Sequence, residues 1–447
     1  MKKDSKTNSR EVALKILFEI ETRGAFADES IDRFSAELNL SSLDRRFLSE
    51  LVNGTVKLRK RIDYLLSFNL NKRVEDLTPW IRNILRMGIY QIEYLSRVPH
   101  RASVDESVKL AMKFGHVGTK NLVNAVLRNH LRKRSQIEFP QENKTRYLAT
   151  FYSFPEWMIK RWLEDFGEEK TKILCGFFNS KPNLSLRLNS LKTDSKSLQR
   201  DFKRSKIRYK KGLFLDDFYY IESKLNLRNF DPLKNGWVYI QDESSVLAVL
   251  LLDPRPKQRI IDLCAAPGGK TAFIAQKMKN AGQVIALDVN EEKRSLIQEN
   301  CRRLGVSNVV TAVGDARNFR LKPVDGILVD APCTGLGTLR KNSDLRWQKT
   351  EKDVKRMKSL QLSILLNAAQ LVKKEGVLVY STCTMTKEEN DEVVEEFLKQ
   401  RDDFRLSHAS SYLFRDLVDD KGMVRTLPHQ HGVDGSFGVR LEKIRDK

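Results

Sequence analysis

The carboxy-terminal half of the chain alternates short apolar runs with segments of helical period, and this alternation restricts the fold more than any other feature. The runs rich in Val, Ile and Leu are residues 259–263, 284–287, 309–313, 326–329, 377–380 and 437–441. Strands that alternate with helices are typical of parallel βαβ units, so residues 236–447 are predicted to form a Rossmann-like, doubly wound α/β domain. Sheets of this kind bind ligands beyond the carboxyl ends of their strands.

Two further parts are predicted before this domain. Residues 1–140 carry apolar side chains at helical spacing, as in Ala13, Ile16 and Leu17, and predict an all-α bundle. Residues 141–235 mix the strand-like stretch NLSLRLNSLKT with helical segments and predict a small α/β subdomain. From residue 192 to 211 this subdomain has nine basic and two acidic side chains, which favours contact with phosphates over a solvated face without a partner.

The charge of the chain indicates a polyanionic partner. Its 447 residues carry a net charge of +22, a balance that most often accompanies nucleic-acid binding. The amino-terminal stretch MKKDSKTNSR has no apolar run behind it, and the longest apolar run, residues 246–252, is far shorter than the ~20 residues of a membrane span. Five cysteines without a CxxC pair argue against a disulfide framework. We therefore expect a cytoplasmic protein with no membrane contact.

The stretch IIDLCAAPGGKTAFIAQ reads as a strand, a glycine-rich loop and a helix. It is neither a Walker A loop nor a GxGxxG loop, because Cys264 stands where the first of these needs glycine. Acids then recur at strand ends, at Asp288, Asp315 and Asp330. Each alone could be a helix cap, but carboxylates at consecutive strand ends can accept from ribose hydroxyls and an adenine amino group. The pattern favours S-adenosylmethionine as the cofactor.

Two cysteines follow two predicted strands, Cys333 in VDAPCTGLG and Cys383 in LVYSTCTM. A thiolate that attacks C6 of a cytosine makes C5 nucleophilic enough to take a methyl group, and a base must then remove the C5 proton. An isolated cysteine is usually a small buried hydrophobe, and Cys175, Cys264 and Cys301 are assigned to that class. Spacing alone places two thiols in one cleft without deciding which of them attacks.

Several long motifs carry a family resemblance. The stretches DLCAAPGGKT, DAPCTGLGTLRKNSDLRW and YSTCTMTKEEN resemble signature motifs of bacterial RNA cytosine-5 methyltransferases, and YIQDESS and DGSFGVRL are similar to theirs as well. The first ~140 residues, with LDRRFLSELVNGTV and PHRASVDESVKLAMKFG, resemble the NusB-type RNA-binding domain. The combination is similar to the Sun/Fmu type, which acts on 16S ribosomal RNA.

The resemblance implies a role for each matching residue. It makes Cys383 the nucleophile on C6, Cys333 the helper in product release, and Asp330 the acid at the cytosine edge. Lys270 is implied as a cation near the target nucleotide or the methionine carboxylate. One departure is NSD at residues 342–344, where the family often has HPD, and it leaves the role of that loop open. The residues implied to bind S-adenosylmethionine are Cys264, Ala265, Ala266, Pro267, Gly268, Gly269, Lys270, Asp288, Asp315 and Asp330.

The expected protein is thus an S-adenosylmethionine-dependent enzyme that makes 5-methylcytosine in 16S ribosomal RNA through a cysteine–C6 adduct. A transfer-RNA cytosine-5 methyltransferase and a non-catalytic RNA-binding factor stay open as alternatives. A DNA cytosine-5 enzyme would use the Pro-Cys thiol and leave the Thr-Cys motif unexplained. We expect no metal, since His429 and His431 have no evident third ligand, and we infer no obligate protein partner.

Overall fold

The computed structural model describes residues 8–446 and divides into two compact units. The helical unit comprises residues up to 180 together with residues 339–348, and the sheet unit comprises residues 181–338 and 349 onward. Most of the basic amino-terminal stretch lies outside the described residues. The expected boundaries at 140/141 and 235/236 stay a prediction. No helix in the described part is long and apolar enough to cross a membrane.

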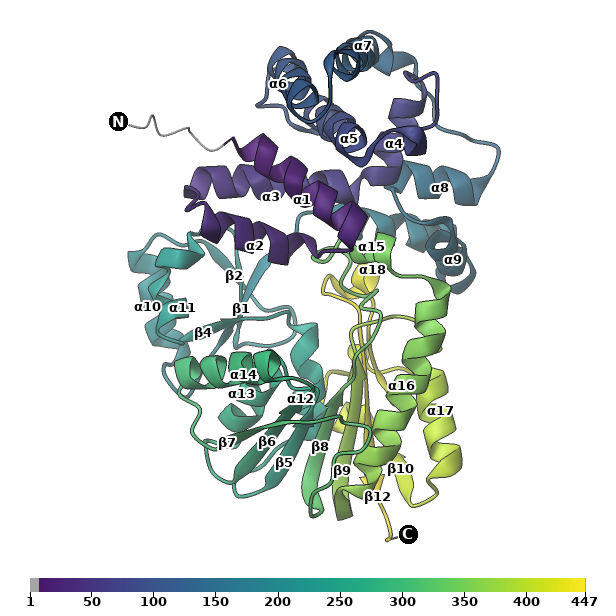
Figure 1. Cartoon of the computed structure of the whole chain (residues 1–447). Helices are drawn as coiled ribbons and strands as arrows, with labels where there is room; N and C mark the ends of the chain where they lie inside the picture. Colours follow the sequence, from purple (N-terminus) through teal and green to yellow (C-terminus); the bar gives the residue numbers. More distant parts are fainter. Residues whose placement is uncertain (1–7, 447) are drawn as a thin grey trace. The chain divides into compact units, whose positions relative to one another are not determined.

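The helical unit is a bundle centred on α5 (Pro79–Tyr94), which packs against α1, α3, α4, α6 and α7 (Figure 1). Pro79 opens α5 at a position where the missing N–H costs no hydrogen bond, and eleven of its sixteen residues are buried. The other helices are α1 (Ser9–Arg23), α2 (Ala27–Glu37), α3 (Ser42–Lys57), α4 (Arg59–Ser67), α6 (His100–Lys113), α7 (Val117–Lys133), α8 (Lys144–Tyr152), α9 (Glu156–Asn179) and α15 (Leu345–Gln348).

The segment 339–348 belongs to the helical unit, although the sequence places it directly after the Pro-Cys motif. The carboxylate of Asp344 accepts a hydrogen bond from the N–H of Ala27 at 3.0 Å, and Ala27 is the first residue of α2. The residue before Ala27 offers no side-chain cap, so Asp344 supplies the acceptor that a capping residue usually provides. The NSD stretch, whose role the sequence left open, therefore has a structural function in the helical unit.

The sheet unit begins with a small antiparallel sheet in the order β2-β3-β1-β4. Its hydrophobic side chains pack with α10 (Ser195–Arg204), whose Leu198 and Phe202 are fully buried. The mixed α/β subdomain expected from the sequence is thus confirmed. Its strands are β1 (Leu184–Leu188), β2 (Tyr209–Lys211), β3 (Phe218–Ile221) and β4 (Val238–Ile240), and α11 (Asp231–Lys234) precedes β4.

The large sheet has the order β10-β12-β9-β8-β5-β6-β7, with β11 paired to β12. The five strands from β9 to β7 are mutually parallel, whereas β12 pairs antiparallel with β9, β10 and β11. Every predicted strand is present, but the sheet is mixed because the chain closes with antiparallel ribbons. The strands are β5 (Arg259–Leu263), β6 (Gln283–Asp288), β7 (Val309–Val313), β8 (Val324–Asp330), β9 (Val372–Thr382), β10 (Phe404–Ser407), β11 (Val424–Thr426) and β12 (Ser436–Lys443).

Helices cover both faces of this sheet, as a parallel sheet requires (Figure 1). Alternate residues of one strand enter different cores: Ile261 packs in the core with α16 and α17, and Ile260 in the core with α12 and α13. This two-sided burial explains why the strands appear in the sequence as continuous apolar runs. The helices are α12 (Leu247–Leu252), α13 (Gly269–Lys277), α14 (Glu291–Leu304), α16 (Glu351–Gln370), α17 (Asp391–Gln400) and α18 (Pro428–His431).

Candidate active site

The candidate site lies at the carboxyl ends of the parallel strands, around the point where the strand order reverses. From β5 the chain builds β6 and β7 on one side and β8 and β9 on the other, so the switch point falls between β5 and β8. Open α/β sheets bind ligands at such points. Cys264 follows β5, Asp288 ends β6, Asp330 ends β8 and Cys383 follows β9. The parallel registers place these strand ends along one edge of the sheet.

The two cysteines of the motifs meet in space, with 3.3 Å between the Sγ atoms of Cys333 and Cys383. Cys383 is exposed and Cys333 is half-buried. The contact with Cys383 and the burial of the site raise the pKa of Cys333 above its usual value. Two sulfurs this close do not readily carry two negative charges, so loss of the proton from one thiol opposes its loss from the other.

Of the other three cysteines, Cys175 and Cys301 are buried and Cys264 is half-buried. Burial raises the pKa of Cys175 to about 12 and that of Cys301 to about 11. Burial also raises the pKa of Cys264, with a further contribution from Asp288. A thiol that stays protonated near neutral pH is a poor nucleophile, so Cys333 and Cys383 are the pair on which thiol chemistry can rest.

A partly buried ion pair lies near the thiols. The Nζ of Lys270, in α13, lies 2.6 Å from Oδ2 of Asp330, and Oγ of Ser381 donates to the other carboxylate oxygen at 2.9 Å. Burial opposes the charge on Lys270, but Asp330 and the nearby Cys383 together raise its pKa above the usual value. The site therefore holds a fixed cation and a fixed carboxylate, each within reach of the same small ligand.

The loop after β5 is shaped by its backbone. Cys264 has a φ of +71° and Gly268 has a φ of +100°, the region that glycine adopts without strain. A methyl group on Gly269, the first residue of α13, would lie 2.6 Å from the ring of Tyr239, so only glycine fits there. The N–H of Ala266 donates to Oδ2 of Asp288 at 2.8 Å, which ties this loop to the end of β6.

Asp315 stands apart from the buried acids. It lies just beyond β7, and its carboxylate is paired with Arg317 at 2.5 Å, which lowers its pKa. The preceding residue, Gly314, donates its N–H to the backbone oxygen of Asp288 at 3.0 Å. The structure thus brings the chain of Asp315 next to the end of β6, while its side chain remains partly exposed and engaged by an arginine.

Two buried carboxylates were not identified from the sequence. Asp262 accepts from the hydroxyl of Thr271 at 2.6 Å, and complete burial raises its pKa to about 7. Glu389, in the loop after β9, is also fully buried. Asp262 lies two positions before Cys264 inside an apolar strand, which was an available signal. Glu389 lies in the polar stretch TMTKEEN, which resembles a solvated loop in sequence.

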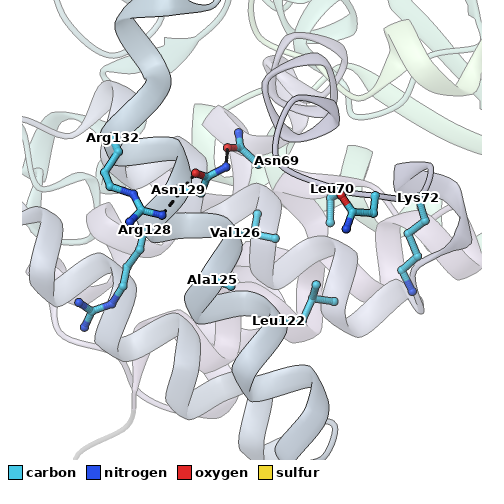
Figure 2. A pocket seen from close by; sticks show the side chains of 10 residues that line it. Asn69, Leu70, Lys72, Leu122, Ala125, Val126, Arg128, Asn129 and Arg132 are labelled. Carbon is cyan, nitrogen blue, oxygen red and sulfur yellow. Dashed lines mark hydrogen bonds between the residues drawn. The ribbon is translucent and has the colours of Figure 1, made fainter.

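A separate basic pocket of about 670 Å³ lies within the helical unit (Figure 2). Lys72, Arg128 and Arg132 contribute cations, and its ten lining residues include no acidic side chain. Asn129 donates to Asn69 at 2.8 Å and so joins α7 to the segment after α4. The lining residues are Asn69, Leu70, Asn71, Lys72, Leu122, Ala125, Val126, Arg128, Asn129 and Arg132.

Neither unit offers a ready metal site among its described residues. No group of three or more His, Cys, Asp or Glu side chains is arranged there to hold a metal ion. The two histidines considered from the sequence, His429 and His431, lie together in the short helix α18.

Comparison with known families assigns each part of the chain. Residues 249–442 match the family described as 16S rRNA methyltransferase RsmB/F, and residues 7–132 match the NusB family. Residues 154–228 match the ferredoxin-like domain of RsmF/B-like methyltransferases. The chain is similar to the probable ribosomal RNA small subunit methyltransferases B of Bacillus subtilis, at 38% identity, and of Synechocystis, at 34%. Both matches cover 98% of this chain and 99% of the relative.

Solved structures show the same architecture. The crystal structure of PH0851 matches with a TM-score of 0.82 and 25% identity, covering 98% of this chain and 99% of that one. A methyltransferase homolog protein from Pyrococcus horikoshii matches with a TM-score of 0.57 and 27% identity, over 66% of this chain and 97% of its own. Fold and matches together define a Rossmann-like methyltransferase that carries a NusB-like helical domain. More particularly, the chain belongs to the RsmB/F family of 16S rRNA methyltransferases.

Proposed function

We propose that the protein transfers a methyl group from S-adenosylmethionine to C5 of a cytosine in 16S ribosomal RNA, at position 967, through a covalent adduct between Cys383 and C6. The single observation that carries this proposal is the pair of sulfurs, 3.3 Å apart, beside the Lys270–Asp330 ion pair. A thiolate that adds to C6 of a cytosine makes C5 nucleophilic enough to take a methyl group.

The chain's own residues supply each step of this chemistry. The Cys383 thiolate forms a bond to C6, and the electron pair of the C5–C6 double bond moves toward C5 while negative charge grows on N3 and O2. Lys270 lies where a cation can stabilise that charge, and the Asp330 carboxylate lies where it can accept from the amino group of the base and orient it. Once C5 has taken the methyl group, Cys333 releases its own proton to water and takes the C5 proton, and the electron pair left at C5 breaks the C6–S bond to free Cys383. The base must leave its stack to reach the sulfurs, which favours single-stranded or loop RNA.

The cofactor loop fits a nucleoside that carries a carboxylate and a positive charge. S-adenosylmethionine would supply the methyl group as an electrophile. The start of α13, which has nine residues, offers unpaired N–H groups to the methionine carboxylate. Asp288 and Asp330 end β6 and β8, the two strands that flank β5, where carboxylates can accept ribose hydroxyls and face a sulfonium charge. Residues 264–270 and Asp315 complete the proposed cofactor site.

Methylation of RNA by the purified full chain tests the proposal. With labelled S-adenosylmethionine and a 16S rRNA transcript, we expect label in the RNA, recovered as 5-methylcytidine and mapped by bisulfite sequencing to position 967. Absence of label under conditions where the cofactor binds would exclude the enzyme and favour the non-catalytic RNA-binding factor. Label in transfer RNA but not in 16S rRNA would favour the alternative substrate.

The basic pocket of the helical unit supports an RNA-binding role for that unit, and it makes a separate prediction. The variant Lys72→Ala, Arg128→Ala, Arg132→Ala is expected to weaken binding of a 16S rRNA fragment by about tenfold or more, because it can neutralise fewer phosphates. The slope of log affinity against log salt should fall by about 1 per cation removed. Arg101→Ala is the control, because the Arg101 side chain on α6 is exposed and outside the pocket, and it should leave the slope unchanged. An unchanged slope in the triple variant would exclude this pocket as a phosphate-binding surface.

A further inference from the structure

Glu389 lies at the centre of a buried hydrogen-bond network. Its carboxylate accepts from the backbone N–H of Thr334 at 2.8 Å and from the Thr334 hydroxyl at 2.5 Å. It also accepts from the hydroxyl of Thr386 at 2.9 Å and from the amide of Gln361 at 3.0 Å. Glu389 is fully buried. Its four donors are neutral, so hydrogen bonds, and no cation among these partners, stabilise the buried carboxylate.

This network binds the residue that follows each of the two cysteines. Thr334 follows Cys333, Thr384 follows Cys383, and their hydroxyl oxygens lie 3.1 Å apart. The amide of Gln361 also donates to the carbonyl of Pro332 at 2.9 Å. Cys333 is therefore held on both sides, through Pro332 by Gln361 and through Thr334 by Glu389.

The Cys383 loop is fixed by the neighbour of Glu389. The side chain of Asn390 accepts from the hydroxyl of Thr382 at 2.6 Å and donates to the carbonyl of Thr384 at 3.1 Å. The residues before and after Cys383 are thus both bound to Asn390. The adjacent residues Glu389 and Asn390 consequently set where the two sulfurs lie, by binding the residues next to each cysteine.

We propose that Glu389 is a positioning residue that fixes Cys333 against Cys383 and, through its buried negative charge, makes Cys333 the sulfur that keeps the proton while Cys383 attacks. The proposal rests on the function proposed above and assigns the two thiols their different roles in it.

The charges around the sulfurs are arranged asymmetrically. Lys270 interacts with Cys383, whereas the groups that raise the pKa of Cys333 are Cys383 itself, then burial, then Glu389. Tyr380 donates its hydroxyl to the carbonyl of Glu389 and stays protonated, because burial and the neighbouring Cys333 and Glu389 raise its pKa. Asp330 is paired with Lys270. A carboxylate therefore disfavours the thiolate at Cys333, whereas the charged group that interacts with Cys383 is a cation.

The same arrangement accounts for a change of role during turnover. Once sulfur is bonded to C6, Cys383 carries no negative charge, and the largest cause of the raised pKa at Cys333 is gone. Cys333 can then release its proton to water and accept the C5 proton, while the electron pair of the C5–H bond expels Cys383 as a thiolate. The pair returns to one thiol and one thiolate, and one proton is released overall.

Alkylation of the two thiols tests the proposal without RNA or cofactor. Peptide mass spectrometry after iodoacetamide treatment gives separate rates for Cys333 and Cys383 between about pH 6 and about pH 10. Glu389→Gln keeps the shape of the side chain, and the threonine hydroxyls can rotate to accept from its amide. In this variant we expect the ratio of Cys333 to Cys383 alkylation to rise at least about tenfold, the equivalent of one pKa unit.

A second variant separates position from charge. Glu389→Ala removes the acceptor of the Thr334 N–H and should release the Cys333 loop, so that with RNA and cofactor the covalent complex persists at least about tenfold longer than in the unmodified protein. Glu392→Gln is the control. Glu392, on α17, forms an ion pair with Lys358 of α16, and its substitution should change neither the alkylation ratio nor the adduct lifetime.

The outcomes are distinct from those of the proposed function. A ratio that stays within about twofold in Glu389→Gln, together with an unchanged adduct lifetime in Glu389→Ala, would overturn the role of Glu389 even if the unmodified protein methylates RNA. Failure of the unmodified protein to methylate RNA would instead overturn the proposed function, whatever the alkylation ratio. Circular dichroism of both variants identifies loss of folding, in which case Glu389→Asp repeats the alkylation test.

Discussion

Cys383→Ala is expected to abolish both methyl transfer and the covalent RNA adduct, whereas Cys333→Ala is expected to form the adduct and then accumulate it. The two sulfurs lie 3.3 Å apart, so both can reach the same cytosine. They differ in their surroundings, because the pKa of Cys333 is raised by its contact with Cys383 and by burial. A thiol that keeps its proton cannot make the first attack, but it can take part in proton transfer once the adduct exists.

Denaturing gel electrophoresis of protein–RNA mixtures measures the adduct, and labelled cofactor measures methyl transfer. Loss of the nucleophile should lower turnover by a factor on the order of 10⁴ or more, because catalysis then has no covalent step. Cys301→Ala is the matched control: Cys301 is buried, with a pKa raised to about 11, and its loss should leave turnover within about twofold. The assignment is reversed if Cys333→Ala loses the adduct while Cys383→Ala keeps it.

The position of the site could be predicted because strand ends are local features of the sequence. Every predicted strand was found, and a parallel sheet places the residues after its strands along one edge. The sequence alone therefore predicts that one edge of the sheet carries Cys264, Asp288, Asp330 and Cys383. The antiparallel pairings of β12 with β9, β10 and β11 were harder to predict, because β10 and β11 are short and strand direction depends on pairing partners.

The features that sequence reasoning missed all depend on burial or on distant partners. Glu389 is preceded by Lys387 and Glu388, and nothing local distinguishes this fully buried acid from the residues before it. Residues 339–348 continue a catalytic motif in sequence but pack in the helical unit. Arg346 in this segment is fully buried, which is unusual for an arginine and is set by partners from three other segments. Such placements follow from tertiary contacts that a local pattern does not encode.

Arg346→Ala is expected to destabilise the helical unit by about 2–4 kcal/mol, because several buried acceptors lose their donor at once. The guanidinium donates to the carbonyls of Lys57 and Ser153 at 3.2 and 3.1 Å and to the side chain of Asn179 at 3.0 Å. It also lies 3.9 Å from the ring centroid of Phe154. Arg346 is fully buried, so the substitution takes a donor away from oxygens inside the unit.

The pH dependence of this loss follows from the charge of Arg346. Burial lowers its pKa to about 9 in the folded protein, below the 12.5 expected in the unfolded chain. The unfolded chain therefore binds more protons only between those values, and the contribution of Arg346 to stability rises with pH in that window alone. Between about pH 6 and about pH 8 the group is charged in both states, so the loss on substitution should be the same at either pH.

Hydrogen exchange locates the loss, which a global unfolding curve of a two-unit protein cannot do. Faster exchange is expected at the end of α3, near Lys57, and at the end of α9, near Asn179. The exchange rates in Arg346→Lys should lie between those of the unmodified protein and those of Arg346→Ala, because an ammonium has donors but cannot span the same set of oxygens. Arg356→Ala is the control, since that exposed side chain pairs with Asp353 on its own helix and should change stability by no more than about 0.5 kcal/mol. If exchange in α3 and α9 is unchanged in Arg346→Ala, then segment 339–348 packs on the helical unit without stabilising it.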